Sequence, residues 1–149
     1  MKADLHNHSY YSDGLLSPSE VVNLAAINEC DLFSLTDHDS INGIAEARLE
    51  AERVGLKFIT GVEISALWGN MAIHIIGLGI DVNDDVLRAG LEHNQELRKT
   101  RAEKIALSLR RSGIKDPLEK AQNISGGHML TRTHFAQMLI QEGYCKDMK

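Results

Sequence analysis

Short apolar runs alternate with amphipathic helical segments through the first 64 residues. Residues 17–27 and 42–54 have helical patterns, the first opening with a capping box and the second stopped by Gly55. Three runs with strand character start about 25 residues apart, at residues 3–8, 31–36 and 56–64. Strands that alternate with helices of this length predict parallel βαβ units, and right-handed crossovers place their successive strands side by side.

A β-hairpin is predicted next, because Gly69 and Asn70 separate two apolar runs. With these residues as the turn, Ser65 faces His74, and Glu63 becomes a diagonal neighbour of His74 on one sheet face. A shift of one residue would put Glu63 and His74 on opposite faces. The rest of the chain predicts a long helix or a helix pair over residues 84–112, and shorter helices over 116–123 and 131–143.

Charge and cysteine content narrow the class of protein. The formal net charge of −5 argues against a dedicated nucleic-acid binder. Residues 1–63 hold eleven acidic and four basic side chains, a net −7, whereas residues 98–115 hold seven basic and one acidic, a net +6. An acidic region suits metal cations and a basic one an anionic ligand, although a solvated helix is the simpler explanation of residues 98–115. Two cysteines, no signal peptide and no membrane-length apolar run predict a cytoplasmic protein with no membrane partner.

Ionisable residues gather at the carboxyl ends of the predicted strands, where α/β folds bind ligands. Any one of them has an ordinary explanation as a capping or hydrogen-bonded residue. Together they would crowd carboxylates and leave imidazoles in need of partners unless cations compensate, so we predict a metal site. The six candidate ligands are His6, His8, Asp13, His38, Glu63 and His74.

The ligand types favour zinc, manganese or iron, because imidazole and carboxylate are present without thiolate. Asp4 and Asp39 are candidates to orient the histidines from outside. Clustered divalent ions favour hydrolysis of phosphate esters, with metal-bound hydroxide as the nucleophile. We expect up to three ions, held by His6 with His8, by Asp13 with His38, and by His74, with Glu63 as a bridge. The chain has neither a nucleophile-elbow motif nor a phosphate loop.

Four segments carry a family resemblance: "DLHNHSYYSDG", "LTDHDS", "GVEIS" and "HIIGLGI". In this order they resemble the successive motifs of the PHP family, named for polymerase and histidinol phosphatase, and the resemblance covers essentially the whole chain. It implies a distorted (β/α)7 barrel with a trinuclear metal centre, and its ligands fall on the six residues named above. Residues 1–83 would then be N-terminal βα units of the barrel, and residues 84–149 a helical insertion.

The segment after His74 and "TRTHFAQMLIQEGY" resemble a subgroup of stand-alone phosphoesterases. Members of this subgroup act on nucleoside monophosphates, nucleoside 3′,5′-bisphosphates and short oligonucleotides. The resemblance implies that Arg132 and His134 reach the substrate phosphate, and an arginine near a helix start is well placed for this. The alternative for His134 is packing on Phe135 and Met138 of its own helix.

The chain departs from the family in length. Three further ligands normally lie in an Ala-His-Pro motif and an Asp-x-His pair, and neither occurs here. Three or four strands also cannot close a barrel, which takes about 250 residues in its eightfold relative. We therefore expect the N-terminal part of a larger enzyme, with an incomplete barrel, incomplete metal sites and an open sheet edge that favours self-association.

Three functions remain in competition. The first is a metal-dependent phosphoesterase that hydrolyses nucleoside monophosphates or 3′,5′-bisphosphates. The second is a 5′–3′ exonuclease on short RNA or DNA, which would use the same metals and the basic stretch. The third is a truncated, non-catalytic metal-binding module, suggested by the missing ligands. The expected partner is a small nucleotide or short oligonucleotide substrate, with no stable nucleic-acid complex.

Overall fold

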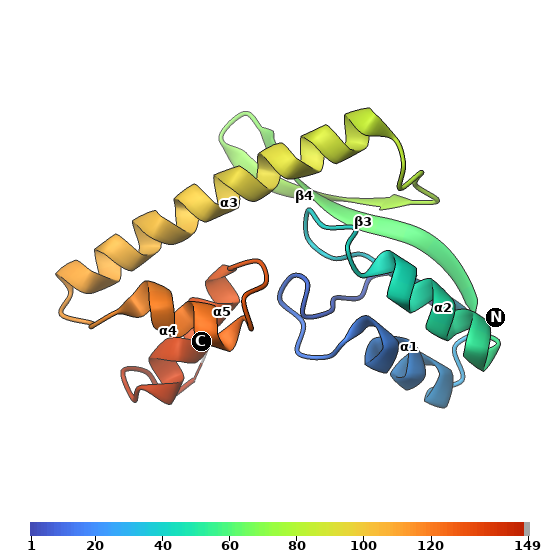
Figure 1. The fold of residues 1–149 in the computed structure, drawn as a ribbon, viewed down its shortest axis with the longest axis horizontal. Coiled ribbons are helices and arrows are strands. Elements are labelled where there is room, and N and C mark those ends of the chain that lie inside the picture. The colour runs from blue at the N-terminus through green and yellow to red at the C-terminus, as the bar shows by residue number, and fades with distance from the viewer. Residues whose placement is uncertain (148–149) are drawn as a thin grey trace. The chain divides into compact units, whose positions relative to one another are not determined.

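The computed structural model describes residues 1–147 and shows a mixed α/β fold with a curled sheet (Figure 1). Contacts divide the chain into two compact units, Met1–Asn94 and the residues from Gln95 onward. The elements, in chain order, are β1 (Ala3–Asp4), α1 (Pro18–Ile27), β2 (Leu32–Leu35), α2 (Ile44–Val54), β3 (Lys57–Trp68), β4 (Met71–Leu78), α3 (Asp85–Arg111), α4 (Pro117–Ile124) and α5 (Arg132–Gln141). The boundary between the units falls inside α3. The predicted domain boundary at residues 83–84 stays a prediction.

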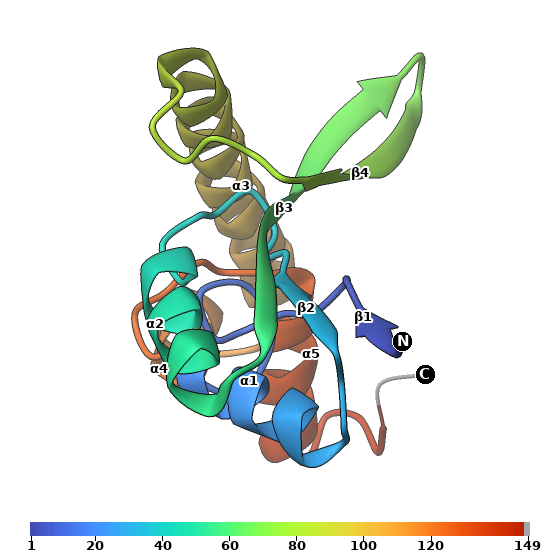
Figure 2. The same ribbon diagram turned by 90° about the vertical axis from the view of Figure 1, so that its right-hand side faces the viewer.

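The sheet of the first unit has the strand order β1-β2-β3-β4. The pairs β1–β2 and β2–β3 are parallel, and β3–β4 is antiparallel. Helices α1 and α2 lie side by side along the parallel strands (Figure 2). The parallel βαβ units predicted from the alternating pattern are therefore confirmed, with each strand beside its neighbour in sequence.

The core of the first unit forms where α1 and α2 meet β2. Phe33 and Leu35 project from β2 and are almost fully buried, together with Val22 of α1. Ala47 and Ala51 lie four residues apart on one face of α2 and have no exposed surface. Their small side chains let α2 pack closely against α1 and β2. This packing helps to position β2 and the segment that follows it.

The first predicted strand is shorter than expected. Residues 3–8 were expected to be extended, but only Ala3–Asp4 pairs as β1, so His6 and His8 lie beyond the strand. The physical reason is a change of partner at Asn7, whose N–H donates to the side-chain Oγ1 of Thr36 at 3.2 Å. The Thr36 N–H donates in return to the Asn7 carbonyl at 2.9 Å. The segment stays beside β2 but leaves the regular ladder.

The hairpin has the predicted register. Ser65 pairs with His74 across β3 and β4, and Gly69 adopts a φ of 60° in the turn. Strand β3 runs from Lys57 to Trp68 without a break, so the predicted strand over residues 56–64 and the first arm of the hairpin form one element.

The second unit contains the C-terminal part of α3 with α4 and α5. Its core is a cluster of buried residues from all three helices and the connection between the first two: Ala102, Ala106, Ile114, Ala121, Phe135 and Met138. The stretch expected to be one helix or two is the single helix α3. None of the helices described in residues 1–147 is long and apolar enough to span a membrane.

Candidate metal centre

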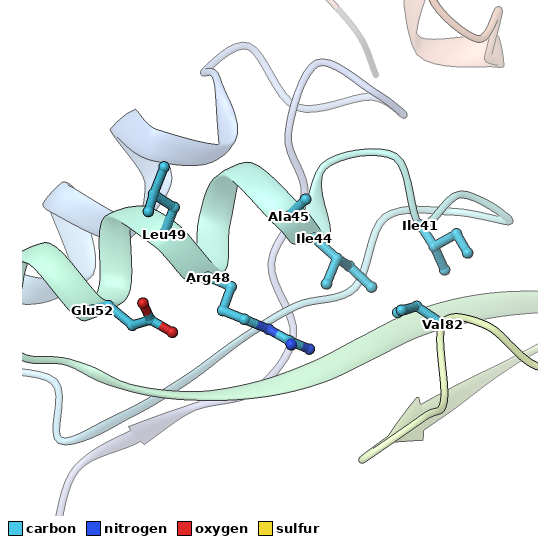
Figure 3. Close-up of a pocket in the computed structure, with 7 residues that line it drawn as sticks. All are labelled: Ile41, Ile44, Ala45, Arg48, Leu49, Glu52 and Val82. Atoms are coloured by element: carbon cyan, nitrogen blue, oxygen red, sulfur yellow. The ribbon is translucent and has the colours of Figure 1, made fainter.

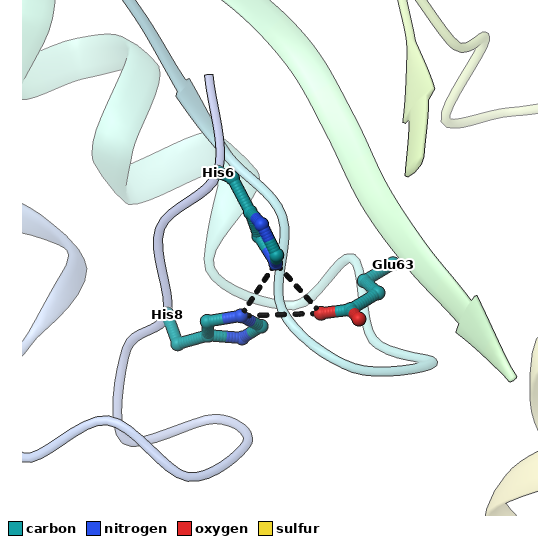
Figure 4. Close-up of side chains that lie close together, drawn as sticks. All are labelled: His6, His8 and Glu63. Carbon is teal, nitrogen blue, oxygen red and sulfur yellow. Dashed lines mark hydrogen bonds and ion pairs between the residues drawn. The ribbon is translucent and has the colours of Figure 1, made fainter. Parts of the chain in front are cut away.

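One buried carboxylate, that of Glu63, lies within reach of four histidines. Its side chain is only 6% exposed. Four imidazole nitrogens lie near its oxygens: Nε2 of His6 at 3.0 Å, Nε2 of His8 at 3.1 Å, Nδ1 of His38 at 3.3 Å and Nδ1 of His74 at 2.7 Å. Figure 4 shows His6 and His8 converging on Glu63 from one chain segment. The hairpin register accounts for the His74 contact, as predicted.

Opposing effects act on the pKa of Glu63. Burial alone would raise the pKa of the carboxyl group. Hydrogen bonds with His6 and His74, and the positive charges that His38 and His8 can carry, act against burial and hold the pKa of Glu63 below its ordinary value. The carboxylate form is therefore favoured at the point where cations would bind.

Asp13 extends the cluster beside His8 and His38. Its carboxylate oxygens lie 3.7 Å from Nδ1 of His8 and 3.8 Å from Nε2 of His38. Ligand atoms of the six residues fall into three groups, each with its atoms within 4.8 Å of one another: His6–His8–Glu63, His8–Asp13–His38 and His38–Glu63–His74. All six residues that the sequence singled out are thus brought together. Imidazole nitrogen and carboxylate oxygen make a donor set that fits zinc, manganese or iron.

Backbone pairing holds the middle of the cluster. An isolated parallel bridge joins His38 to Glu63, beyond the regular end of β2. Asp39 N–H donates to the Glu63 carbonyl at 2.8 Å, and Glu63 N–H donates to the Asp37 carbonyl at 3.2 Å. These bonds set the spacing of His38 and Glu63 independently of any ion.

Asp37 anchors the loop that follows the candidate ligand His8. Its buried carboxylate accepts hydrogen bonds from the N–H of Ser9 at 2.7 Å, from Ser9 Oγ at 2.6 Å and from Ser12 Oγ at 2.6 Å. Ser12 Oγ lies in turn 3.3 Å from Nδ1 of His8. The same loop is closed at Gly14, where an added Cβ would lie 2.3 Å from the His8 carbonyl oxygen. No sequence pattern predicts these roles for Ser9 and Ser12, and the only signal for Asp37 is its place directly before His38.

Asp39 anchors the other side of the cluster. It is fully buried with a φ of 48°. Its carboxylate accepts hydrogen bonds from Ser65 N–H at 2.8 Å, Ser65 Oγ at 2.7 Å and Asn94 Nδ2 at 2.8 Å. These contacts join the loop after β2 to β3 and to α3. Asp39 therefore has a structural role in fixing the position of that loop. The proposed orientation of histidines by Asp4 and Asp39 stays a prediction, and Asp4 is exposed.

Arg132 and His134 lie at the start of α5, in the second unit. Arg132 is exposed, whereas His134 is 4% exposed. Nδ1 of His134 accepts a hydrogen bond from Thr131 N–H at 3.1 Å, which completes a capping box with Thr131. This contact gives His134 a structural role within its helix, and the expected role of both residues at the substrate phosphate stays a prediction.

A separate hollow of about 340 Å³ lies along α2 (Figure 3). Ile44 and Leu49 of α2 and Val82, which follows β4, supply apolar walls, and Arg48 and Glu52 add charge. None of the six clustered residues lines it, so it is no part of the candidate metal centre.

Comparisons with known proteins agree with this geometry. A 3′,5′-nucleoside bisphosphate phosphatase of Chromobacterium violaceum is 44% identical over 147 residues, which cover 98% of this chain and 52% of that protein. A 5′-3′ exoribonuclease of Haemophilus influenzae is 42% identical over 142 residues, covering 95% of this chain and 52% of that protein. The chain therefore spans about half the length of these curated relatives.

A solved structure from Chromobacterium violaceum shares the fold. It is described as an amidohydrolase with bound sulfate and no metal. It matches with a TM-score of 0.94 at 44% identity, covering 99% of this chain and 52% of that one. The family model described as "PHP domain" matches residues 4–113. This match spans most of the chain and all six clustered residues, and the chain belongs to the PHP family.

Proposed function

We propose that this protein is a metal-dependent phosphoesterase that hydrolyses small nucleotide phosphate esters, with nucleoside monophosphates or 3′,5′-bisphosphates as substrates. The observation that carries the proposal is the buried Glu63 carboxylate with four histidine nitrogens at 2.7–3.3 Å. Several imidazole nitrogens gathered around one carboxylate are the ligand types that zinc, manganese or iron prefer. Relatives named as a nucleoside bisphosphate phosphatase and as an exoribonuclease support the substrate class.

The six clustered residues are the proposed ligands for divalent manganese, iron or zinc, with up to three ions. Glu63, His8 and His38 each belong to two of the three groups. Glu63 has two carboxylate oxygens and would be the bridge between ions, whereas each neutral histidine would bind one ion through one nitrogen. When bound, such ions lower the pKa of water and neutralise charge on a phosphoryl group. Asp37 and Asp39 hold the ligands in place through the loop after His8 and through β3.

We further propose a cytoplasmic location and a partial (β/α)7 barrel.

Arg132 and His134 are the proposed contacts to the substrate phosphate. The exposed guanidinium of Arg132 at the N-terminus of α5 suits a phosphate dianion. Sulfate, which the solved relative contains, is a tetrahedral anion of similar shape. The buried position of His134 means that it would act first by holding the start of α5.

The direct test combines metal content with phosphate release. The full-length protein is loaded with Mn²⁺, Fe²⁺ or Zn²⁺, bound metal is counted by mass spectrometry, and phosphate release is followed with AMP and a nucleoside 3′,5′-bisphosphate. Glu63→Gln should lose bound metal and activity together. Glu50→Gln is the matched control, because Glu50 pairs with Arg53 on α2. Metal-loaded full-length protein that releases no phosphate from any nucleotide would refute the proposed activity.

A second candidate is a 5′–3′ exonuclease on short RNA or DNA. Two observations favour it: the name of the Haemophilus influenzae relative, and the net +6 charge of residues 98–115. The two activities separate in one assay, because an exonuclease should cleave a dinucleotide faster than it dephosphorylates a mononucleotide.

A further inference from the structure

The Asp37 carboxylate fixes the direction of its hydrogen bonds. Residue Asp37 is 2% exposed, and three donors converge on it, two from Ser9 and one from Ser12. An ionised carboxylate only accepts hydrogen bonds. Oδ1 accepts the Ser9 N–H and also lies 2.6 Å from Ser12 Oγ. Because the carboxylate can only accept, the Ser12 hydroxyl is the donor in this contact.

The Ser12 hydroxyl then has no proton left for His8. A hydroxyl carries one hydrogen, and that of Ser12 is directed at Asp37. At 3.3 Å from His8 Nδ1, the Ser12 oxygen must therefore accept, which places the proton of the neutral imidazole on Nδ1. The other ring nitrogen, Nε2, is left with its lone pair.

The opposite side of the His8 ring faces His6 and Glu63. His8 Nε2 lies 3.1 Å from His6 Nε2, and His6 Nε2 lies 3.0 Å from Glu63 Oε2. Two ring nitrogens this close cannot both direct protons at each other. Glu63 Oε2 lies 3.1 Å from His8 Nε2 as well, so either imidazole can donate to this carboxylate, and the assignment of the His8 tautomer rests on the Ser12 contact.

We propose that Ser12 and Asp37 are positioning residues that hold His8 in its Nδ1–H tautomer, with the Nε2 lone pair directed into the cluster. The functional meaning of this tautomer depends on the proposed metal centre. A histidine binds a metal through its unprotonated nitrogen, which here would be Nε2. The Ser12 contact favours the Nδ1–H tautomer, in competition with the contact between His8 Nε2 and Glu63 Oε2.

The first test reads the tautomer directly in metal-free protein. Imidazole ¹⁵N and ¹H correlations are recorded at about pH 8, where histidine is mostly neutral. Wild-type His8 should be the Nδ1–H tautomer, and Ser12→Ala should shift it to a mixture or to Nε2–H. Ser9→Ala is the matched control, because it removes a serine from the same carboxylate without touching His8. An Nε2–H signal in the wild type, or no change in Ser12→Ala, would overturn the assignment.

The second test measures Zn²⁺ affinity by competition with a chromophoric chelator. Ser12→Ala should weaken binding about 10- to 100-fold, the usual cost of removing such an outer partner. Ser9→Ala should lower the melting temperature yet keep most of the affinity. Equal losses in both variants would mean that Asp37 only stabilises the loop, and the proposal would fall. If the wild-type chain binds no Zn²⁺, the proposed metal centre fails, and the metal-free tautomer alone decides on Ser12 and Asp37.

Discussion

Asp39→Ala should be among the most destabilising changes in the first unit. The variant removes the acceptor for three donors: Ser65 N–H at 2.8 Å, Ser65 Oγ at 2.7 Å and Asn94 Nδ2 at 2.8 Å. A buried donor left unsatisfied costs about 1–3 kcal/mol. The Ser65 hydroxyl can rotate towards another acceptor, and Asn94 already donates to the Ser65 carbonyl. The cost for these two side-chain donors should therefore lie at the low end of that range. The Ser65 backbone N–H cannot turn towards another acceptor, so its cost should lie in the middle of that range.

Alanine at position 39 adds a backbone cost. The φ of 48° is left-handed, which Asp and Asn tolerate and which costs Ala about 1 kcal/mol. Removal of a buried carboxylate relieves its desolvation and offsets part of the loss. The expected sum is about 3–5 kcal/mol, against a total of about 5–15 kcal/mol for an ordinary domain.

Asp39→Asn is the matched variant, because it keeps the size and the backbone preference and removes the charge. We expect it to lose about 1–2 kcal/mol, since one oxygen remains to accept. The assay is urea unfolding at constant pH, followed by circular dichroism, with the slope checked for change. Amide exchange of Ser65 gives a local readout that should quicken in both variants. A loss below about 1 kcal/mol for Asp39→Ala, or equal losses for both, would refute the reasoning.

Three further predictions concern the loop, the surface and the metal centre. Gly14→Ala should lower the melting temperature and weaken Zn²⁺ binding, because its Cβ would lie 2.3 Å from the His8 carbonyl oxygen; unchanged melting would contradict this. Hydrogen bonding to Arg53 lowers the pKa of Glu50 from 4.5 to about 2. Its stabilising effect is therefore full above about pH 4.5 and is lost as the pH falls towards 2, so Glu50→Gln should flatten the acid dependence of the melting temperature over that window. Zn²⁺ at 100 times its Kd should stabilise the chain by about 2.7 kcal/mol, because only the folded state assembles the ligands, and Glu63→Gln should reduce that gain in a thermal-shift assay.

The hairpin and the six clustered residues could be predicted from the sequence because short-range rules determine them. A two-residue Gly69-Asn70 turn fixes the register, and the register puts His74 diagonally across from Glu63. The carboxyl-end rule for parallel strands then gathers the remaining ligands. Their gathering into three overlapping groups, each with its ligand atoms within 4.8 Å of one another, could be expected without knowledge of side-chain contacts.

The supporting residues could not be predicted in the same way. Asp37 contacts Ser9 and Ser12 from 25 or more positions away in the sequence. The loop that contains Ser9 and Ser12 has no periodic pattern that would predict these contacts. The early end of β1 has a similar cause, because the Asn7–Thr36 exchange of side-chain and backbone hydrogen bonds is a tertiary contact. Hydrogen bonds of this kind compete with regular pairing and become visible only once the two segments are placed together.

The three residues Asp37, His38 and Asp39 show how one short segment can hold the whole cluster. The first carboxylate binds the loop that carries His8, and the second binds β3 and α3, while the histidine between them faces Glu63. Because the two flanking carboxylates are satisfied by serine and amide donors, their contacts do not depend on a cation. The ligand spacing is thus set by hydrogen bonds of the fold, and a metal ion would meet a site that is largely formed. Binding to such a preorganised site spends little free energy on rearrangement, so the affinity of the cluster should respond to Asp37 and Asp39 as well as to the ligands themselves.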